Sequence, residues 1–315
     1  MNEKLDIIAI GEALIELSSN AKMSDTECLY KYYGGDTLAA AVAALRAGSK
    51  VGFITRVGND SFKDFLIRSW QKEGLDISNV KISDEPNGLY IIARPSVDEK
   101  EAVYYRKKIA PSKISIEDIN SDYITNSKCL YSSGITQALS PSANEAVEYA
   151  FKIAKQAGVI TAYDPNFHKA LMDENSAKEN FSRILPYVDI LFMSTKHDTK
   201  TILEVESPEN IIKKLFDKGI QTVILKSIEQ KGYYTGYNGN ISFTEFYTND
   251  YIDTTCSGDA FNGGFLHALT SGFNCAEAVK FAAIVAGLQA KGIGAIKSIP
   301  YKDNVYQIFR GNKQE

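Results

Sequence analysis

Cysteine and histidine are scarce in this chain of 315 residues, and basic residues are not in excess. Its four cysteines lack the spacing of metal ligands, so a reducing cytoplasm is the expected setting. The formal net charge of −4, with Lys and Arg spread along the chain, provides no basic surface for nucleic acid. No apolar run approaches the roughly 20 residues that span a bilayer. We therefore expect neither nucleic acid nor a membrane as a partner.

Strand-like and helix-like segments alternate along most of the chain, which predicts a mainly parallel sheet covered on both faces. Strands are predicted at residues 7–10, 51–55, 129–132, 159–163, 190–193 and 222–226, and helices at 38–47, 62–73, 143–157, 177–185, 208–217 and 260–271. In residues 12–33 and 86–111, strands follow one another without room for crossover helices. The expected fold class is therefore α/β, a doubly wound mainly parallel sheet with a small antiparallel β sheet.

The most informative segment is residues 253–265, with the sequence DTTCSGDAFNGGF. Ser257 and Gly258 lie where a helix begins, and its free backbone N–H groups and positive dipole end attract an anion. Asp259 is placed to take a proton from a hydroxyl group that attacks a phosphate. The local pattern alone also fits an ordinary helix cap with a glycine turn.

Two further motifs lie in the N-terminal half, GEALIEL at residues 11–17 and GGDTL at residues 34–38. The glycine pair allows backbone to approach a ligand, and Asp36 or Thr37 can cap the helix that follows. Farther along, strands predicted at residues 88–94 and 102–107 alternate so that Tyr104 and Arg106 share a face. That face joins an aromatic wall to a guanidinium able to bind a carboxylate, although a solvated polar strand face is the alternative.

Together these motifs resemble the ribokinase-like (PfkB) carbohydrate kinases, whose signature is usually Asp-Thr-Thr-Gly-Ala-Gly-Asp-Ala-Phe. Within that family, the sequences at residues 15–18, 34–38, 88–90 and 104–107 look like 2-keto-3-deoxygluconate kinases. The resemblance covers residues 6 to about 301 and implies one ribokinase-like kinase domain over residues 1–315. It also implies that two segments, at about residues 12–33 and 86–111, form a β lid over the sugar. The same lid is the implied contact surface of a homodimer.

The resemblance assigns roles to individual residues. Asp259 would be the general base, and the Cys256, Ser257 and Gly258 amides would hold the transferred phosphoryl group. The residues expected to bind substrate are Gly34, Gly35, Tyr90, Tyr104, Arg106, Ile135, Asn166 and His168. The residues expected to bind the nucleotide are Ser194, Lys226, Gly232, Ser257 and Gly258. ATP and Mg²⁺ are the implied cofactors, with a monovalent cation as a further candidate and no metal-ligating residue assigned.

The chain departs from the family pattern at several positions. His168 replaces an arginine that helps to hold the substrate acid, so the KM for an acid should rise between about pH 6 and 8 as the imidazole loses its charge. At residues 194–197 the sequence STKH replaces a motif that orders magnesium-bound water, leaving Asp198 as the nearest carboxylate. Ala39 and Ala283 replace asparagines, and Cys256-Ser257 replaces Gly-Ala.

The expected function is ATP-dependent phosphorylation of a sugar or sugar acid, 2-keto-3-deoxygluconate being favoured. A fructokinase or another PfkB-type sugar kinase is the first alternative, supported by Gly294-Ala295. A catalytically weak protein of the same fold, binding a sugar or a nucleotide, is the alternative from another class. Asp259 favours the enzyme, because a protein that only binds has no use for a base at that position.

Overall fold

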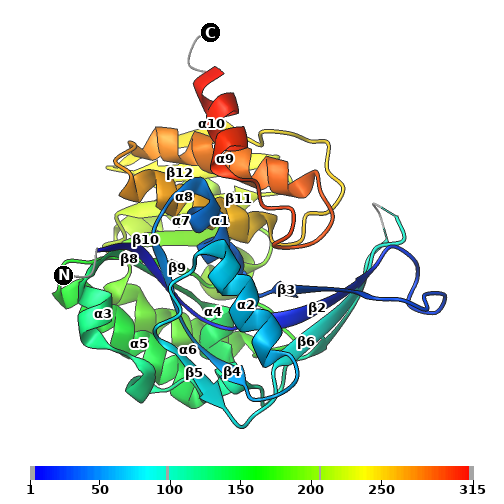
Figure 1. Ribbon diagram of the computed structural model, residues 1–315. Coiled ribbons are helices and arrows are strands. Elements are labelled where there is room, and N and C mark those ends of the chain that lie inside the picture. The colour runs from blue at the N-terminus through cyan, green and yellow to red at the C-terminus, as the bar shows by residue number, and fades with distance from the viewer. Residues whose placement is uncertain (1–3, 97–98, 206, 312–315) are drawn as a thin grey trace.

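The computed structural model describes residues 4–96, 99–205 and 207–311. A large sheet has the strand order β13-β12-β11-β10-β9-β8-β1-β4-β5 and forms the centre of the molecule (Figure 1). The strands from β11 to β5 along this order are parallel, and β12 and β13 are added antiparallel at one edge. The bounds of these strands are β1 Leu5–Ile10, β4 Val51–Gly58, β5 Val80–Ser83, β8 Ser127–Ser133, β9 Ile160–Asp164, β10 Ile190–Ser194, β11 Thr222–Ser227, β12 Gly232–Tyr237 and β13 Asn240–Glu245.

Helices cover both faces of the large sheet, which confirms the doubly wound α/β fold. The α-helices are α1 Asp36–Ala47, α2 Lys63–Glu73, α3 Ser121–Thr125, α4 Gly134–Ala138, α5 Pro141–Gln156, α6 Glu174–Ile184, α7 Pro208–Phe216, α8 Ser257–Thr270, α9 Cys275–Ala290 and α10 Lys302–Gly311. Short helical turns occur at Ala110–Lys113, Ile116–Asp118, Leu185–Tyr187 and Thr199–Leu203. The predicted strands and helices are all present, with ends shifted by a few residues.

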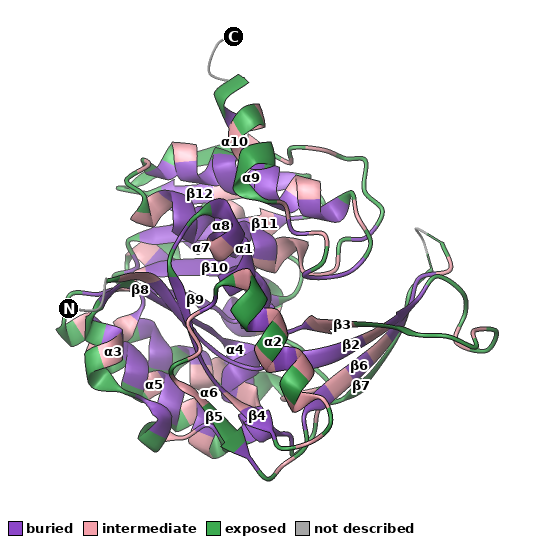
Figure 2. Ribbon diagram, in the orientation of Figure 1, coloured by how far each residue is buried: buried purple, intermediate pink, exposed green. Residues whose placement is uncertain are grey.

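Two hydrophobic cores lie on opposite faces of the sheet because successive side chains of a strand point in opposite directions. In β1, Ile7 and Ala9 join the core under α1, α2, α8, α9 and α10, whereas Ile8 and Ile10 join the core under α3, α5, α6 and α7. Figure 2 shows this burial running through the sheet and the facing sides of the helices. In the described part of the chain, no helix combines the length and apolarity that a membrane span requires.

A small sheet of four strands, in the order β3-β2-β6-β7, projects from one side of the molecule (Figure 1). Its strands are β2 Leu14–Ser19, β3 Tyr30–Gly34, β6 Gly88–Ala93 and β7 Glu101–Tyr105. The two outer pairings are antiparallel, and the central pairing of β2 with β6 is parallel. Residues 97–98, in the connection from β6 to β7, lie outside the described residues.

Candidate active site

The candidate site lies where the parallel strands end. In open α/β sheets ligands bind beyond the carboxyl ends of the strands, because the connecting loops gather there. The chain follows this rule: Glu12 comes after β1, Asp164 ends β9, Ser194 ends β10 and Lys226 lies near the end of β11. Helix α8 also begins at this edge, since its first turn contacts Lys226. Charged side chains from distant parts of the chain therefore meet around one helix terminus.

The turn at which α8 begins has the geometry of an anion site. Cys256 is the N-cap residue, with φ of 63° and ψ of 12°. This is a left-handed conformation, which glycine, the residue expected here from the resemblance, adopts readily. Holding a non-glycine residue there costs on the order of 1 kcal/mol or more. Cys256 contributes no capping side-chain hydrogen bond. The Ser257 N–H donates to the Thr254 carbonyl oxygen at 3.1 Å, which leaves the N–H groups of Gly258 and Asp259 for a ligand.

Lys226 supplies a positive charge beside this turn. A Cβ atom added to Gly258 would lie 3.4 Å from Lys226 Nζ, which shows how closely the ammonium approaches the backbone. Lys226 Nζ is 2.6 Å from Asp164 Oδ2, and the Asn262 amide donates a 2.8 Å hydrogen bond to the same oxygen. Asn262 also donates to the Tyr131 hydroxyl at 3.0 Å. This network fixes Lys226 and keeps the buried Asp164 carboxylate satisfied.

Asp259 lies in the first turn of α8, as predicted, and is partly buried. Loss of hydration raises the pKa of its carboxyl group well above the usual range, and the charges of Asp36 and Asp164 raise it further. Lys226 opposes this shift by favouring the carboxylate. A carboxylate with a raised pKa is a stronger base than an ordinary aspartate, which suits it to accept a proton from a hydroxyl group.

Four of the residues predicted to bind substrate form one cluster at the base of the small sheet. The Tyr90 and Tyr104 rings stack with centroids 5.5 Å apart, and His168 meets Tyr104 edge-on at 6.1 Å. The Arg106 guanidinium lies over the Tyr104 ring at 5.5 Å, which confirms that these two side chains share a face. The cluster combines an aromatic surface with a cation, as a sugar-acid pocket requires.

Arg106 is already paired with a carboxylate, the buried Glu12. Burial, against the opposing charge of Arg106 and with a smaller contribution from the charge of Asp36, raises the pKa of Glu12 to about 7. One carboxylate oxygen of Glu12 is buried without a hydrogen-bond partner among the described residues. The Arg106 side chain therefore has a competing anion beside it, and Glu12 retains an acceptor for a ligand hydroxyl group.

The predicted capping role of Asp36 and Thr37 is wrong. Gly35 is the N-cap residue of α1, with φ of 131°, and a Cβ atom there would come within 2.4 Å of the Glu12 carbonyl oxygen. Only glycine fits this position, so it displaces the polar residues from the cap. Asp36 instead accepts a 3.3 Å hydrogen bond from the Asn166 amide and raises the pKa of Asp259.

The remaining residues predicted to bind substrate occupy the same region to different extents. Gly34 packs against Tyr90, because a Cβ atom on Gly34 would lie 2.4 Å from the tyrosine hydroxyl oxygen. Asn166 reaches Asp36 as described above. Ile135 is a buried residue of α4, which follows β8. Its contact with a substrate stays a prediction.

His168 lies exposed at the rim of the cluster, and its charge differs from the expectation. Partial burial of the ring lowers the pKa of His168 below its usual value, and the nearby charges of Arg106 and His197 lower it further. The lowered pKa favours the neutral imidazole, so the loss of charge moves toward the acidic side of the pH range of 6 to 8 expected from the sequence. The rise in KM for an acid over that range stays a prediction.

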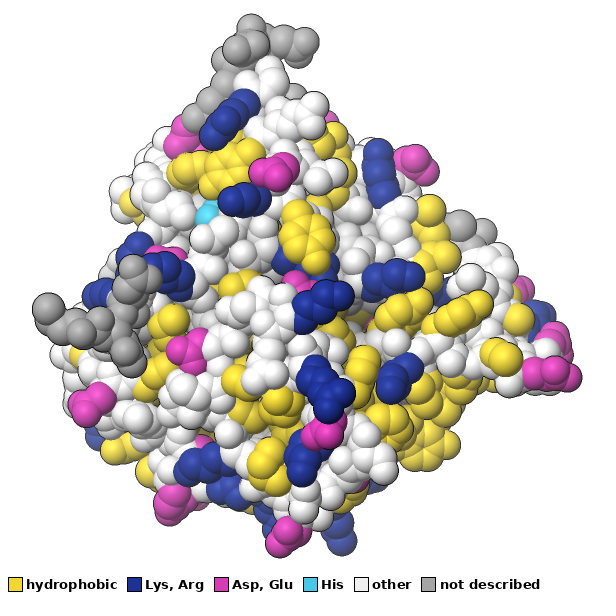
Figure 3. Space-filling view, viewed as in Figure 1, with side chains coloured by type: hydrophobic (Ala, Val, Ile, Leu, Met, Phe, Trp, Pro, Cys, Tyr) yellow, Lys and Arg dark blue, Asp and Glu magenta, His cyan; other side chains and the backbone are white. Residues whose placement is uncertain are grey.

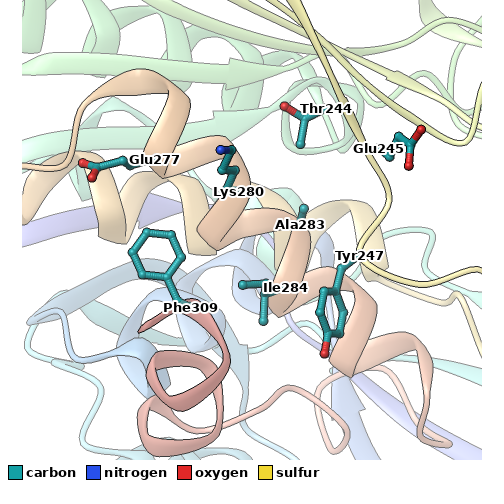
Figure 4. A pocket seen from close by; sticks show the side chains of 8 residues that line it. All are labelled: Thr244, Glu245, Tyr247, Glu277, Lys280, Ala283, Ile284 and Phe309. Carbon is teal, nitrogen blue, oxygen red and sulfur yellow. The ribbon is translucent and has the colours of Figure 1, made fainter. Parts of the chain in front are cut away.

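A cavity of about 410 Å³ extends from the turn along α9. Ser257 and Thr254 line the end near the turn, and the rest of the wall is mostly aromatic or small: Tyr233, Phe246, Tyr247, Tyr251, Ala283, Ala286, Gly287 and Ala290. An apolar slot that ends at a helix N-terminus can hold a nucleobase together with its phosphates. A smaller hollow of about 290 Å³ between β13, α9 and α10 shares Tyr247 and Ala283 with it (Figure 4).

The other residues predicted to bind the nucleotide differ in position. Gly232 lies between Lys231 and Tyr233, which line the larger cavity, but its own Cα faces the Phe243 ring of β13. Ser194 turns its hydroxyl group back to accept hydrogen bonds from the Lys196 and His197 amides. Neither Gly232 nor Ser194 is among the residues that line this cavity, so their contact with a nucleotide stays a prediction.

Asp198 is not free to face a metal ion. Its two carboxylate oxygens accept hydrogen bonds from the Phe167 amide at 2.7 Å and the Ser194 amide at 2.6 Å. Burial raises the pKa of Asp198 to about 7, and the charge of Asp164 adds to the effect. Within residues 4–96, 99–205 and 207–311, no three Asp, Glu, His or Cys side chains converge as a metal site. The described residues therefore form no ready-made metal cage.

Several residues of the site were not predicted. Glu12 and Asp36 lie inside the motifs at residues 11–17 and 34–38, so their acidic character beside glycines was an available signal, and Asp164 directly follows the strand predicted at residues 159–163. Tyr247 and Tyr251 lie in a segment without strand or helix periodicity, and Asn262 faces inward from α8. Sequence spacing gives no indication of what these three contact.

Known proteins share both the sequence and the architecture. The sequence model of the family described as pfkB family carbohydrate kinase matches residues 4–302 of this chain. A 2-dehydro-3-deoxygluconokinase from Thermoproteus tenax is 31% identical over 303 residues, which cover 94% of this chain and 91% of the relative. A 5-dehydro-2-deoxygluconokinase from Clostridium perfringens is 24% identical over 321 residues, covering 99% and 95%. The structure of a ribokinase II candidate from E. coli, in complex with ATP and Mg²⁺, shares the fold with a TM-score of 0.88, 21% identity, and coverage of 98% and 99%. The chain therefore belongs to the pfkB family of carbohydrate kinases.

Proposed function

We propose that this protein transfers the γ-phosphoryl group of ATP to a terminal hydroxyl group of 2-keto-3-deoxygluconate, also called 2-dehydro-3-deoxygluconate, or of a close sugar acid. The observation that carries the proposal is the position of Asp259 in the first turn of α8, close enough to the Asp36 carboxylate for that charge to raise the pKa of Asp259. The 31% identical relative from Thermoproteus tenax supports the choice of substrate. Arg106 in the aromatic cluster supports it independently, because a guanidinium recognises a carboxylate.

In this proposal the sugar acid lies against Tyr90 and Tyr104, with its carboxylate toward Arg106. Binding then requires Arg106 to exchange Glu12 for the substrate or to hold both anions. Asp259 accepts the proton of the attacking hydroxyl group, whose oxygen forms the new bond to the γ-phosphorus as the bond to ADP breaks. The N–H groups at the start of α8 and the Lys226 ammonium stabilise the negative charge on the transferred group.

ATP fits the cavity along α9 with its base toward Tyr247 and its phosphates toward Ser257. Mg²⁺ would accompany the triphosphate, since this ion keeps most of its water and binds phosphate oxygens. No protein residue is assigned to it, because Asp198 is tied to backbone amides. A monovalent cation is not part of the proposal, because the carboxylate that could bind it beside the turn, that of the buried Asp253, already pairs with Arg94 at 2.7 Å.

We also propose that the chain works as one kinase domain, with the small sheet as its lid and as the surface of a homodimer. Strand β7 is exposed along its whole length at the edge of this sheet, and Val103 and Tyr105 are 46% and 59% exposed. Figure 3 shows hydrophobic side chains on the side where the sheet projects. Val103→Glu should shift a dimer to a monomer in light scattering, and an unchanged mass would argue against this surface.

The cytoplasm is the proposed location, because ATP is available there. All four cysteines are unpaired in the structure, which suits a reducing compartment.

A substrate panel tests the proposed function. The protein is incubated with ATP and Mg²⁺ together with 2-keto-3-deoxygluconate, 5-dehydro-2-deoxygluconate or fructose, and ADP formation is measured. We expect the highest kcat/KM for 2-keto-3-deoxygluconate, at least about tenfold above fructose, because only an acid presents a carboxylate of its own to Arg106. A preference for fructose would favour the fructokinase alternative, and the absence of sugar-dependent ADP formation would favour the protein that only binds.

A further inference from the structure

Arg94 is a buried arginine at the end of β6 that no part of the proposed reaction uses. Its side chain is 6% exposed, and its Nε atom lies 2.7 Å from Asp253 Oδ2. It also donates hydrogen bonds to the Ser18 hydroxyl at 3.1 Å and to the Thr255 hydroxyl at 3.4 Å. Ser18 belongs to β2, whereas Asp253 and Thr255 precede α8. One guanidinium therefore joins the small sheet to the segment from which the phosphate turn begins.

The segment held by Arg94 is fixed from other directions as well. Asp253 accepts hydrogen bonds from the backbone amides of Thr255 at 3.0 Å and Gly294 at 3.2 Å. The Gln289 amide of α9 donates to the Thr255 carbonyl oxygen at 2.7 Å. The next residue, Cys256, is the N-cap of α8 in its left-handed conformation. Because that conformation is unfavourable for cysteine, it depends on the flanking residues being held in place.

On its other side Arg94 reaches the wall of the sugar pocket. Glu16 is fully buried, with one oxygen 3.7 Å from the Arg94 guanidinium. The other oxygen accepts a 2.5 Å hydrogen bond from the Tyr90 hydroxyl. Tyr90 in turn stacks on Tyr104. A continuous series of buried polar contacts thus runs from the aromatic cluster through Glu16 and Arg94 to the phosphate turn.

We propose that Arg94 is a positioning residue, which holds the phosphate turn against the small sheet so that its N–H groups are aligned for the γ-phosphate. The inference rests on the proposed function for the identity of the phosphate group. A buried ion pair is a poor source of stability compared with apolar packing, so its presence at this junction suits an alignment role. The same charge neutralises Asp253, which would otherwise repel the phosphate nearby.

The test compares Arg94→Ala and Arg94→Lys with Arg46→Ala. Arg46, on α1, is a matched control, because it is equally buried and pairs with Glu73 of α2 at 2.6 Å, while its other hydrogen bonds go to the Ile296 and Ile299 carbonyl oxygens and not to residues 253–256. Calorimetry measures the affinity for ADP and for the non-hydrolysable ATP analogue AMPPNP, and the ratio of the two affinities reports the γ-phosphate contact. Turnover of the sugar acid is measured with and without added guanidinium ion.

For Arg94→Ala we expect the preference for AMPPNP over ADP to fall about tenfold and kcat to fall by at least as much, with partial recovery in guanidinium. Arg94→Lys should lie between this variant and the wild type, and Arg46→Ala should change thermal stability without changing the ratio. An unchanged ratio in Arg94→Ala would overturn the proposal, as would a loss matched by Arg46→Ala. A wild-type protein without sugar turnover would contradict only the proposed function, since the affinity ratio still reports the turn.

Discussion

Lys226 Nζ lies 2.6 Å from Asp164 Oδ2, and the same ammonium approaches the backbone of Gly258 in the first turn of α8. The Asp164 carboxyl group is 2% exposed and the Lys226 side chain 17%, so water screens this pair little. Lys226 therefore acts on two carboxylates. It contacts Asp164, and its charge limits the rise in the pKa of Asp259 that burial causes.

Replacing Lys226 by methionine should affect both stability and the pH profile. Asp164 would remain buried without its cation, which should reduce the free energy of unfolding by about 3 kcal/mol. The pKa of Asp259 should rise, so the acidic limb of the plot of kcat/KM against pH should move to higher pH. Lys155→Met is the control, because Lys155 pairs with Asp189 at the opposite end of the sheet. Equal pH profiles in the two variants would disprove the role of Lys226.

Arg106→Ala should impair sugar acids selectively. The lost charge-assisted hydrogen bonds should raise the KM for 2-keto-3-deoxygluconate about tenfold to a hundredfold, with little change for fructose. Arg68→Ala serves as the control, because this arginine is exposed on α2. Arg106→Lys should retain part of the affinity, since it keeps the charge beside Glu12. Equal losses for the acid and the neutral sugar would show that Arg106 maintains the pocket without recognising a carboxylate.

His168 should contribute to acid binding only at low pH. The pKa of His168 is lowered by partial burial of the ring and by Arg106, so the positive imidazolium form is present only below the usual range around pH 6.5. Calorimetric Kd values for the sugar acid should therefore increase as pH rises toward about 6.5 and remain constant above neutrality. His168→Arg should remove this increase and strengthen binding at pH 7.5. The same pH dependence in both proteins would place His168 outside the binding interaction.

His267 should make the fold sensitive to acid. Burial lowers the pKa of this histidine to about 4, while its ring contacts the Ser49 hydroxyl at 2.8 Å and the Tyr306 hydroxyl at 2.9 Å. The unfolded chain binds the proton near pH 6.5, so the stability is fully present above that pH and is lost as pH falls toward 4. Between pH 7 and 5 the wild type should lose about 2 kcal/mol more unfolding free energy than His267→Gln.

Urea unfolding at the two pH values measures this difference. Parallel losses in the wild type and His267→Gln would show that other groups, such as the nearby Asp6, dominate the acid response.

The sequence predicts those parts of the molecule that depend on local pattern. Interior strands of the large sheet such as β1, β10 and β11 are mostly apolar runs, so their positions follow from composition, whereas β5, β12 and β13 at its edges lack such runs and were not predicted. The pairing of β2 with β6 is parallel and joins segments far apart in the chain, and local alternation contains no information about it. The same limit applies to Arg94 and Asp253, which the sequence separates and the fold brings together.

The site shows the same division between local and tertiary causes. The turn before α8 is recognisable because its glycine and aspartate lie in one short motif. Asp36 also lies in a motif, but the rule that a polar residue caps the following helix predicts the wrong role for it. Gly35 takes the cap because the Glu12 carbonyl group leaves no room for a Cβ atom, a contact between two different segments. The raised pKa of Asp259 likewise arises from neighbours that the chain brings together only on folding.

The reaction of Asp259→Asn with 2-keto-3-deoxygluconate and ATP is the most direct test of the account. We predict that calorimetry gives a Kd for the sugar acid within about threefold of the wild-type value, while formation of the phosphorylated product slows on the order of a hundredfold or more. Asp303→Asn is the matched control, an exposed aspartate in the first turn of α10, and should react at the wild-type rate. Near-normal product formation by Asp259→Asn would contradict its role as the base in sugar phosphorylation.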